Sequence, residues 1–266
     1  MAYISLSTRD INVLEKIKDP ESDPSMAVQV DPSLPKDPNI LDQEVYNAVA
    51  QQEREIILSI QKLEIRSSNA KAESAPVTDI IAEYQKCISQ LGHLIEAHPK
   101  YASAYNNRAQ ALRQLCGDSM LISVPQQLPQ ALLRSVEDPE RRDMARIALS
   151  DLDDAIQLLT PATPYSRLSP QTARTLSMAH TQRAAIYHIT SKLVTLSPLS
   201  VDSRRREAEW TELEFAENAS RDFAMGGRYG NEIAKGLAVS TNPTAKLCGQ
   251  MVREAMKKEY GEEASV

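Results

Sequence analysis

Three neighbouring aspartates have the residue type and spacing that acid–base chemistry needs. Asp151, Asp153 and Asp154 stand in the stretch Ser-Asp-Leu-Asp-Asp. Paired carboxylates can act as general acid and general base. No nucleophile or basic group accompanies them, so we favour the alternative, a solvated helix face whose charge suits the early turns of a helix.

Histidines and cysteines are the other candidates for catalysis or metal binding. They are His93, His98, His180 and His188, and Cys87, Cys116 and Cys248. No carboxylate or cysteine stands at ligand spacing from a histidine, so we predict no metal and no cofactor. Cys87 and Cys248 fall on apolar helix stripes, which favours buried thiols over a nucleophile. We therefore expect no catalytic residues and a protein that is not an enzyme.

Two further motifs could bind phosphate. Arg204, Arg205 and Arg206 form a basic run, but acidic residues follow on the same predicted helix and favour pairing within it. Gly226-Gly227 lacks the strand and glycine pattern of a phosphate loop. We expect this glycine pair to end a helix.

Composition limits the function classes. The net charge of −6 disfavours non-specific binding to nucleic acid or to anionic membranes. No apolar run reaches the roughly 20 residues that span a bilayer, and the first residues lack a signal-peptide pattern. Dispersed cysteines suit a reducing compartment. These features predict an intracellular protein, in the cytoplasm or nucleus.

The helix that begins after Pro99 has the most informative pattern. Ala102, Tyr105, Ala109 and Leu112 recur every three or four residues, which places them on one helix face. A large ring followed by a small residue, behind a helix-ending proline, is typical of the first helix of a tetratricopeptide repeat.

The pattern recurs twice in altered form, and it predicts about three helical pairs. The first pair covers 41–70, where Val49, Ile56 and Ile60 are expected inside and Gln-Gln-Glu-Arg-Glu (51–55) outside, and a helix capped by Thr78. The last pair comprises 175–190 and 207–226, with Asp202 or Ser203 as the cap of its second helix. The scarcity of glycine and of β-branched runs also favours helix. We predict an all-α fold, a short right-handed solenoid of helical hairpins.

The chain divides into three parts. Residues 1–40 contain four Asp-Pro pairs and are expected to be partly disordered, with a short helix at 9–18. Residues 41–260 form the repeat domain, with insertions near 117–140, 160–170 and 191–203. A short helix at 232–238 and a C-terminal helix follow. Leu247, Met251 and Ala255 are expected to bury a stripe of that C-terminal helix against the last repeat as a cap. Residues 261–266 are a tail.

Four stretches resemble the tetratricopeptide repeat protein 36 family. They are Asp10–Glu21, Ala102–Arg113, Ala219–Phe223 with Arg228–Asn231, and Asn242–Met251. The resemblance implies a non-enzymatic interaction protein, with links to heat-shock protein 70 and to tyrosine metabolism. The insertions depart from the family pattern and leave the shape of the groove open.

Stacked hairpins leave a concave groove lined by the first helix of each pair, where a peptide or helix can bind. The predicted binding residues are Asn69, Ser103, Asn106, Asn107, Gln110, Arg113, Gln114, Gln182 and His188. Asn107, and with a looser alignment Asn69, match asparagines that heat-shock-binding repeats use to hold a terminal carboxylate. Met178 and Gln182 stand where such a clamp needs cations, so we do not expect a standard carboxylate clamp.

Two functions remain open at this stage. The first, which we favour, is an adaptor or co-chaperone that binds a protein segment in the groove, for example of a heat-shock protein 70. The second is a scaffold subunit whose groove is filled by its own N-terminus or by the 117–140 insertion, and which binds through its convex face or loops. The sequence does not define the oligomeric state.

Overall fold

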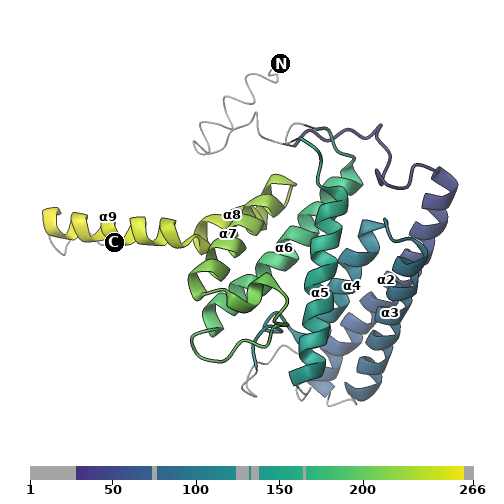
Figure 1. Cartoon of the computed structure of the whole chain (residues 1–266), viewed down its shortest axis with the longest axis horizontal. Coiled ribbons are helices and arrows are strands. Elements are labelled where there is room, and N and C mark those ends of the chain that lie inside the picture. The colour runs from purple at the N-terminus through teal and green to yellow at the C-terminus, as the bar shows by residue number, and fades with distance from the viewer. Residues whose placement is uncertain (1–27, 74–76, 124–131, 133–137, 164–165, 261–266) are drawn as a thin grey trace, which may run out of the picture.

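A computed structural model describes residues 28–73, 77–123, 132, 138–163 and 166–260. The predicted all-α fold of helical hairpins is confirmed in these residues, and each helix between residues 43 and 241 packs against its neighbour along the chain (Figure 1). The pairs are α2 (Gln43–Glu73) with α3 (Val77–Ala97), α4 (Ala102–Cys116) with α5 (Asp138–Leu159), and α6 (Pro170–Leu193) with α7 (Glu212–Arg228).

Small residues at the helix contacts explain why the pairs pack closely. Ala109 and Ala184, the small positions of two first helices, are completely buried, as are Ala148 and Ala155 of α5. Large rings such as that of Tyr84 fill the space between the layers. Alternating small and large side chains in this way reaches the packing density of a protein interior.

Local capping sets where the last pair of helices begins. Ser169 accepts a hydrogen bond from the Thr172 amide, and Pro170 occupies the first turn of α6. α7 starts behind Thr211, which forms a reciprocal capping box with Glu214. The prediction that Asp202 or Ser203 caps this helix was therefore wrong. The residues before Thr211 form only a short 3-10 helix, η2 (Arg206–Glu209).

The glycine pair near the end of α7 allows close helix packing. α7 continues to Arg228, so the prediction that Gly226-Gly227 ends the helix was wrong. Gly230, which follows the helix, has a positive φ of 108°. A Cβ on Gly227 would lie 2.8 Å from the backbone of Lys235 in α8 (Glu232–Thr241). The missing side chains let α8 cover α7, and α8 thereby caps the solenoid.

The C-terminal helix α9 (Pro243–Tyr260) extends away from the rest of the molecule (Figure 1). The expectation that its apolar stripe is buried was wrong: Leu247 and Met251 are 57% and 60% exposed, and Ala255 is exposed as well. Asn242 ends α8, and its side chain accepts hydrogen bonds from the Thr244 and Ala245 amides, so α9 starts as a separate helix.

The described parts of the insertions pack on the helices. Residues 119–123 pair with 198–200 through an antiparallel bridge between Ile122 and Leu199. Leu132 contacts the core. The rest of 124–137, the helix predicted at 9–18 and the tail 261–266 lie outside the described residues. None of the described helices has the length and apolarity needed to cross a lipid bilayer.

Candidate interaction groove

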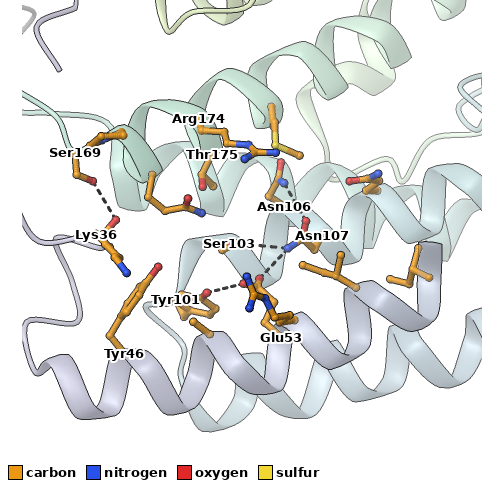
Figure 2. A pocket seen from close by; sticks show the side chains of 18 of the residues that line it. Lys36, Tyr46, Glu53, Tyr101, Ser103, Asn106, Asn107, Ser169, Arg174 and Thr175 are labelled. Atoms are coloured by element: carbon orange, nitrogen blue, oxygen red, sulfur yellow. Dashed lines mark hydrogen bonds between the residues drawn. The ribbon is translucent and has the colours of Figure 1, made fainter. Parts of the chain in front are cut away.

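An open groove of about 760 Å³ runs along α2, α4 and α6, the first helix of each pair (Figure 2). Its walls carry both apolar and polar side chains, for example Ile57 and Gln61 on α2, Gln110 on α4 and Met178 on α6. A second cavity of about 330 Å³ continues from Gln110 and Met178. The first helices thus form the concave surface that the sequence predicts.

Residues 28–40, which we call the strap, cross one end of this groove. The strap pairs with the loop before α6: the Asp31 amide donates to the Leu168 carbonyl (2.8 Å), and the Leu168 amide donates to the Gln29 carbonyl (3.0 Å). Further along, the Ser169 hydroxyl donates to the Lys36 carbonyl. Pro32, Leu34 and Lys36 of the strap line the groove. The strap therefore narrows the groove at the N-terminal ends of α2 and α6.

A buried carboxylate lies on the groove floor. Glu53 of α2 is only 5% exposed. Its oxygens accept hydrogen bonds from the Tyr101 hydroxyl (2.5 Å) and from the Asn107 amide (2.8 Å), as Figure 2 shows. Burial raises the pKa of the Glu53 carboxyl, although the bonds from Tyr101, Ser103 and Asn107 offset part of the rise.

The predicted binding residues on α4 lie mostly along this surface. Ser103, Asn106, Asn107 and Gln110 line the groove, although Asn106 and Asn107 are nearly buried. The side-chain amide of Asn107 donates one hydrogen bond to Glu53 and a longer one, of 3.4 Å, to the Ser103 hydroxyl. These side chains are positioned by one another before any ligand is bound.

Other predicted residues hold the repeats together at the second cavity. The Gln182 amide of α6 donates to the Asn106 side-chain oxygen (2.8 Å), and Arg113 bonds both Gln182 and Asp118. Gln114 donates to Glu64 of α2. Arg113, Gln114 and Gln182 all line the second cavity.

Two predicted residues are not placed with the others. His188 packs edge-on against Phe223 of α7, with ring centres 6.2 Å apart, and does not line either cavity. Asn69 belongs to the last turns of α2, and its side chain lies outside what the structure describes.

Sequence reasoning missed Glu53, which we had placed on the outer face of its helix. Its position carried a signal, because Val49, Glu53, Ile56 and Ile60 follow one another at spacings of four, three and four. Glu53 therefore occupies one position of the apolar stripe. Met178 and Gln182 stand where a carboxylate clamp needs cations, but Arg174 lines the groove one turn before Met178.

Two of the three aspartates that suggested acid–base chemistry, Asp151 and Asp153, form ion pairs with arginines. Asp151 is 1% exposed, so the prediction of a solvated face was wrong for it, and Arg108 bonds both of its oxygens (2.7 and 2.8 Å). Asp153 accepts from Arg183 and Arg205, which join α5 to α6 and to the segment before α7. These carboxylates hold helices together.

The histidines and cysteines differ in burial. His180 is buried, 2.8 Å from Asp222, which also pairs with Arg183. Cys87 and Cys116 are buried, whereas Cys248, expected on a buried stripe, is exposed on α9. Within the described part of the chain, no group of three or more His, Cys, Asp or Glu side chains could hold a metal ion.

Stacked helical hairpins with a groove along their first helices define a protein of the tetratricopeptide-repeat type. The chain is 35% identical to the L-tyrosine degradation gene cluster protein hmgX of Aspergillus fumigatus, over 96% of this chain and 93% of the relative. It is 27% identical to tetratricopeptide repeat protein 36 of Xenopus tropicalis, over 76% of this chain and 67% of the relative. A homologue of the same protein in Drosophila melanogaster is 24% identical over 96% of each chain.

The chain belongs to the same family as the hmgX protein, and these relatives confirm its predicted resemblance to the tetratricopeptide repeat protein 36 family. No family model matches the chain, and no solved structure gives a significant match.

Proposed function

We propose that this protein is a non-enzymatic adaptor that binds a segment of a protein partner in its groove. The observation that carries the proposal is the open groove of about 760 Å³ along α2, α4 and α6, with side chains that are already held in place. Preorganised concave surfaces of stacked repeats suit extended peptides and helices.

The placement of the chemically active side chains supports a binding role over catalysis. Asp151, His180, Glu207 and Asp222 are buried between helices and pair with Arg108, Arg183 or Arg205, or with one another. None of the four lines the groove. A carboxylate that is committed to a buried ion pair cannot exchange protons with a ligand in another part of the molecule.

The name of the Aspergillus relative indicates the pathway. That protein is named for an L-tyrosine degradation gene cluster, and it matches this chain over nearly its whole length. We propose that the partner is an enzyme of L-tyrosine degradation. A heat-shock protein 70, which the family resemblance implies, is the second candidate, and the same experiment tests both.

A pull-down from native extract tests the groove. Arg54 and Arg174 are exposed and line the groove from α2 and α6. Arg54→Glu with Arg174→Glu reverses two charges there, and we expect partner capture to fall at least about tenfold, as lost charge-assisted hydrogen bonds predict. The matched control is Arg142→Glu with Arg221→Glu, two exposed arginines on second helices. Equal capture by both double variants contradicts binding in the groove.

The strap favours a second candidate, a scaffold that closes its own groove. Pro32, Leu34 and Lys36 occupy one end of the groove, and the strap is bonded to the loop before α6. If the strap competes with the partner, deletion of residues 1–40 raises partner affinity or leaves it unchanged. If the strap forms part of the binding surface, the deletion lowers affinity. Calorimetric titration with the captured partner distinguishes the two outcomes.

A further inference from the structure

The groove floor holds a carboxylate that has no cation beside it. Among the described residues, no lysine, arginine or histidine forms an ion pair with Glu53 or with the equally buried Asp37, whereas the buried acids Asp151, Glu207 and Asp222 each pair with an arginine. The donors to Glu53, which are Tyr101, Asn107 and Ser103, are neutral. A buried carboxylate without a positive partner costs folding free energy, which a cation brought by a ligand would offset.

The Glu53 carboxylate can accept a further donor. An ionised carboxyl group has about four acceptor sites, and hydrogen bonds from Tyr101, Asn107 and Ser103 use three of them. Glu53, Tyr101, Asn107 and Ser103 all line the open groove. A flexible side chain that ends in an ammonium or guanidinium group has the chemistry to reach this floor from the groove.

The same contacts oppose a ligand that brings a carboxylate. The Asn107 amide, which would hold a terminal carboxylate in a clamp, already donates to Glu53. A peptide carboxylate at Asn107 would lie beside the carboxylate of Glu53, and like charges at short range repel strongly in a partly buried site. The charge preference at the groove floor is thus the reverse of that of a carboxylate clamp.

The rim of the groove carries the opposite charge. Arg54 and Arg174 are exposed on α2 and α6, and Figure 2 shows Arg174 across the groove from Glu53. Lys36 of the strap lies over the Tyr46 ring, 5.6 Å from its centre. Glu64, the other acid in the groove, accepts a hydrogen bond from Gln114. The groove therefore presents an anion on its floor and cations above it.

Resting on the proposed function, we propose that the partner segment carries a lysine or arginine that reaches Glu53, with acidic residues on either side that meet the rim cations. This pattern matches the charges of floor and rim at once. A purely basic segment is repelled by Arg54 and Arg174, and a segment that offers a terminal carboxylate is repelled by Glu53.

Nuclear magnetic resonance titration with short blocked peptides tests the proposal. The probes are acetyl-Glu-Lys-Glu-amide and acetyl-Glu-norleucine-Glu-amide, which differ only in the terminal ammonium of the central side chain. We expect the lysine peptide to bind about tenfold more tightly and to shift the side-chain amide signal of Asn107, the donor to Glu53. Equal affinities, or no shift with the lysine peptide, overturn the proposal.

The variant Glu53→Gln tests the assignment to this residue. Glutamine keeps the size of the side chain and removes its charge, so the preference for the lysine peptide should disappear. A carboxylate clamp predicts the reverse: Glu53→Gln and a free C-terminal carboxylate on the peptide would both strengthen binding. Thermal unfolding serves as the control for folding. The variant removes an unpaired buried charge but also one of the two oxygens that accept from Tyr101 and Asn107, so the criterion is a cooperative transition and not an unchanged melting temperature.

The same variant, used with the captured partner, separates this inference from the proposed function. If Arg54→Glu with Arg174→Glu loses the partner while Glu53→Gln retains it, the groove binds the partner but the cation anchor is wrong. If neither variant changes partner capture, binding in the groove is itself wrong.

Discussion

At the scale of single residues, the ionic side chains of this protein mainly connect helices. Glu207 is fully buried, accepts a hydrogen bond from the Tyr187 hydroxyl (2.6 Å) and pairs with Arg205 (2.9 Å). Arg205 also reaches Asp153. Arg205, the middle residue of the basic run, is thus paired with Glu207 next to the run and with Asp153 on α5.

The first prediction concerns the pH dependence that Glu207 confers. Burial alone would raise its pKa, but bonds from Arg205 and Tyr187 lower the pKa from 4.5 to about 2. Ionised Glu207 therefore stabilises the folded state by about 3 kcal/mol above pH 4.5, and this contribution is lost as the pH falls towards 2. We expect Glu207→Gln to be destabilised at neutral pH, with less than half of the difference remaining near pH 3. Urea unfolding of both proteins at the two pH values measures this, and a pH-independent difference contradicts it.

The second prediction concerns the pair of Asp151 and Arg108. Asp151→Asn leaves the Arg108 guanidinium, 21% exposed, without its carboxylate, and we expect a loss of about 3 kcal/mol of unfolding free energy. The control is Asp143→Asn, which breaks an exposed pair with Arg146 on the same helix α5 and should cost less than about 0.5 kcal/mol. Similar losses in the two variants would contradict the view that Asp151 is buried in a structural pair.

At the scale of helices, close approach decides how the solenoid ends. α8 packs on α7 because Gly226 and Gly227 leave room for the backbone of α8 and for Thr181 of α6. The Ser177 hydroxyl donates to the Gly226 carbonyl, which fixes α6 on the same turn of α7. Alanine at these positions would favour the helix locally but would collide with its neighbours.

The third prediction compares two glycines in adjacent helices. Gly227→Ala places a methyl group 2.8 Å from Lys235 backbone atoms, so we expect it to destabilise the protein by about 1–3 kcal/mol. Gly236 has open space around its missing side chain, so Gly236→Ala should stabilise by about 0.5–1 kcal/mol through helix propensity. Chemical denaturation measures both, and equal signs would contradict the packing of α8 on α7.

At the scale of the whole molecule, the body of the solenoid and its two ends differ in how they are held. The strap is bonded to the loop before α6 and narrows the groove, so the N-terminal end takes part in the candidate site. At the other end α9 extends from the body, and Leu247, Met251 and Val252 are exposed. The cap of the solenoid is α8, and α9 contributes little to the core.

The fourth prediction follows for α9. Removal of residues 243–266 should lower the melting temperature by no more than about 2 °C, because the deleted side chains bury little apolar surface on the body. Removal of residues 229–266 also deletes α8 and uncovers Phe223 and Ala184, so we expect a much larger loss. Thermal unfolding followed by circular dichroism makes the comparison. A large drop with the shorter deletion would show that α9 packs on the body in solution.

The sequence by itself determined the helices and their pairing. Periodic apolar residues, such as Ala102, Ala109 and Leu112, depend only on local backbone geometry, so they predicted an all-α fold with the hairpins that the structure contains. Prolines and caps located most helix ends, although the exact start of α7 depended on Thr211 and Glu214. The spacing of Glu53 within an apolar stripe also predicts that it is buried. Its charged side chain favoured the opposite prediction, an exposed residue.

Only the tertiary structure decided which distant side chains meet. Arg108 and Asp151, like Glu53 and Asn107, belong to different helices, and their contacts depend on how those helices stack. The same holds for the strap on the loop before α6 and for α9, whose apolar stripe predicted burial against the last repeat but is exposed. Helix formation follows from neighbours in sequence, whereas contacts between helices follow from the packing of the whole chain.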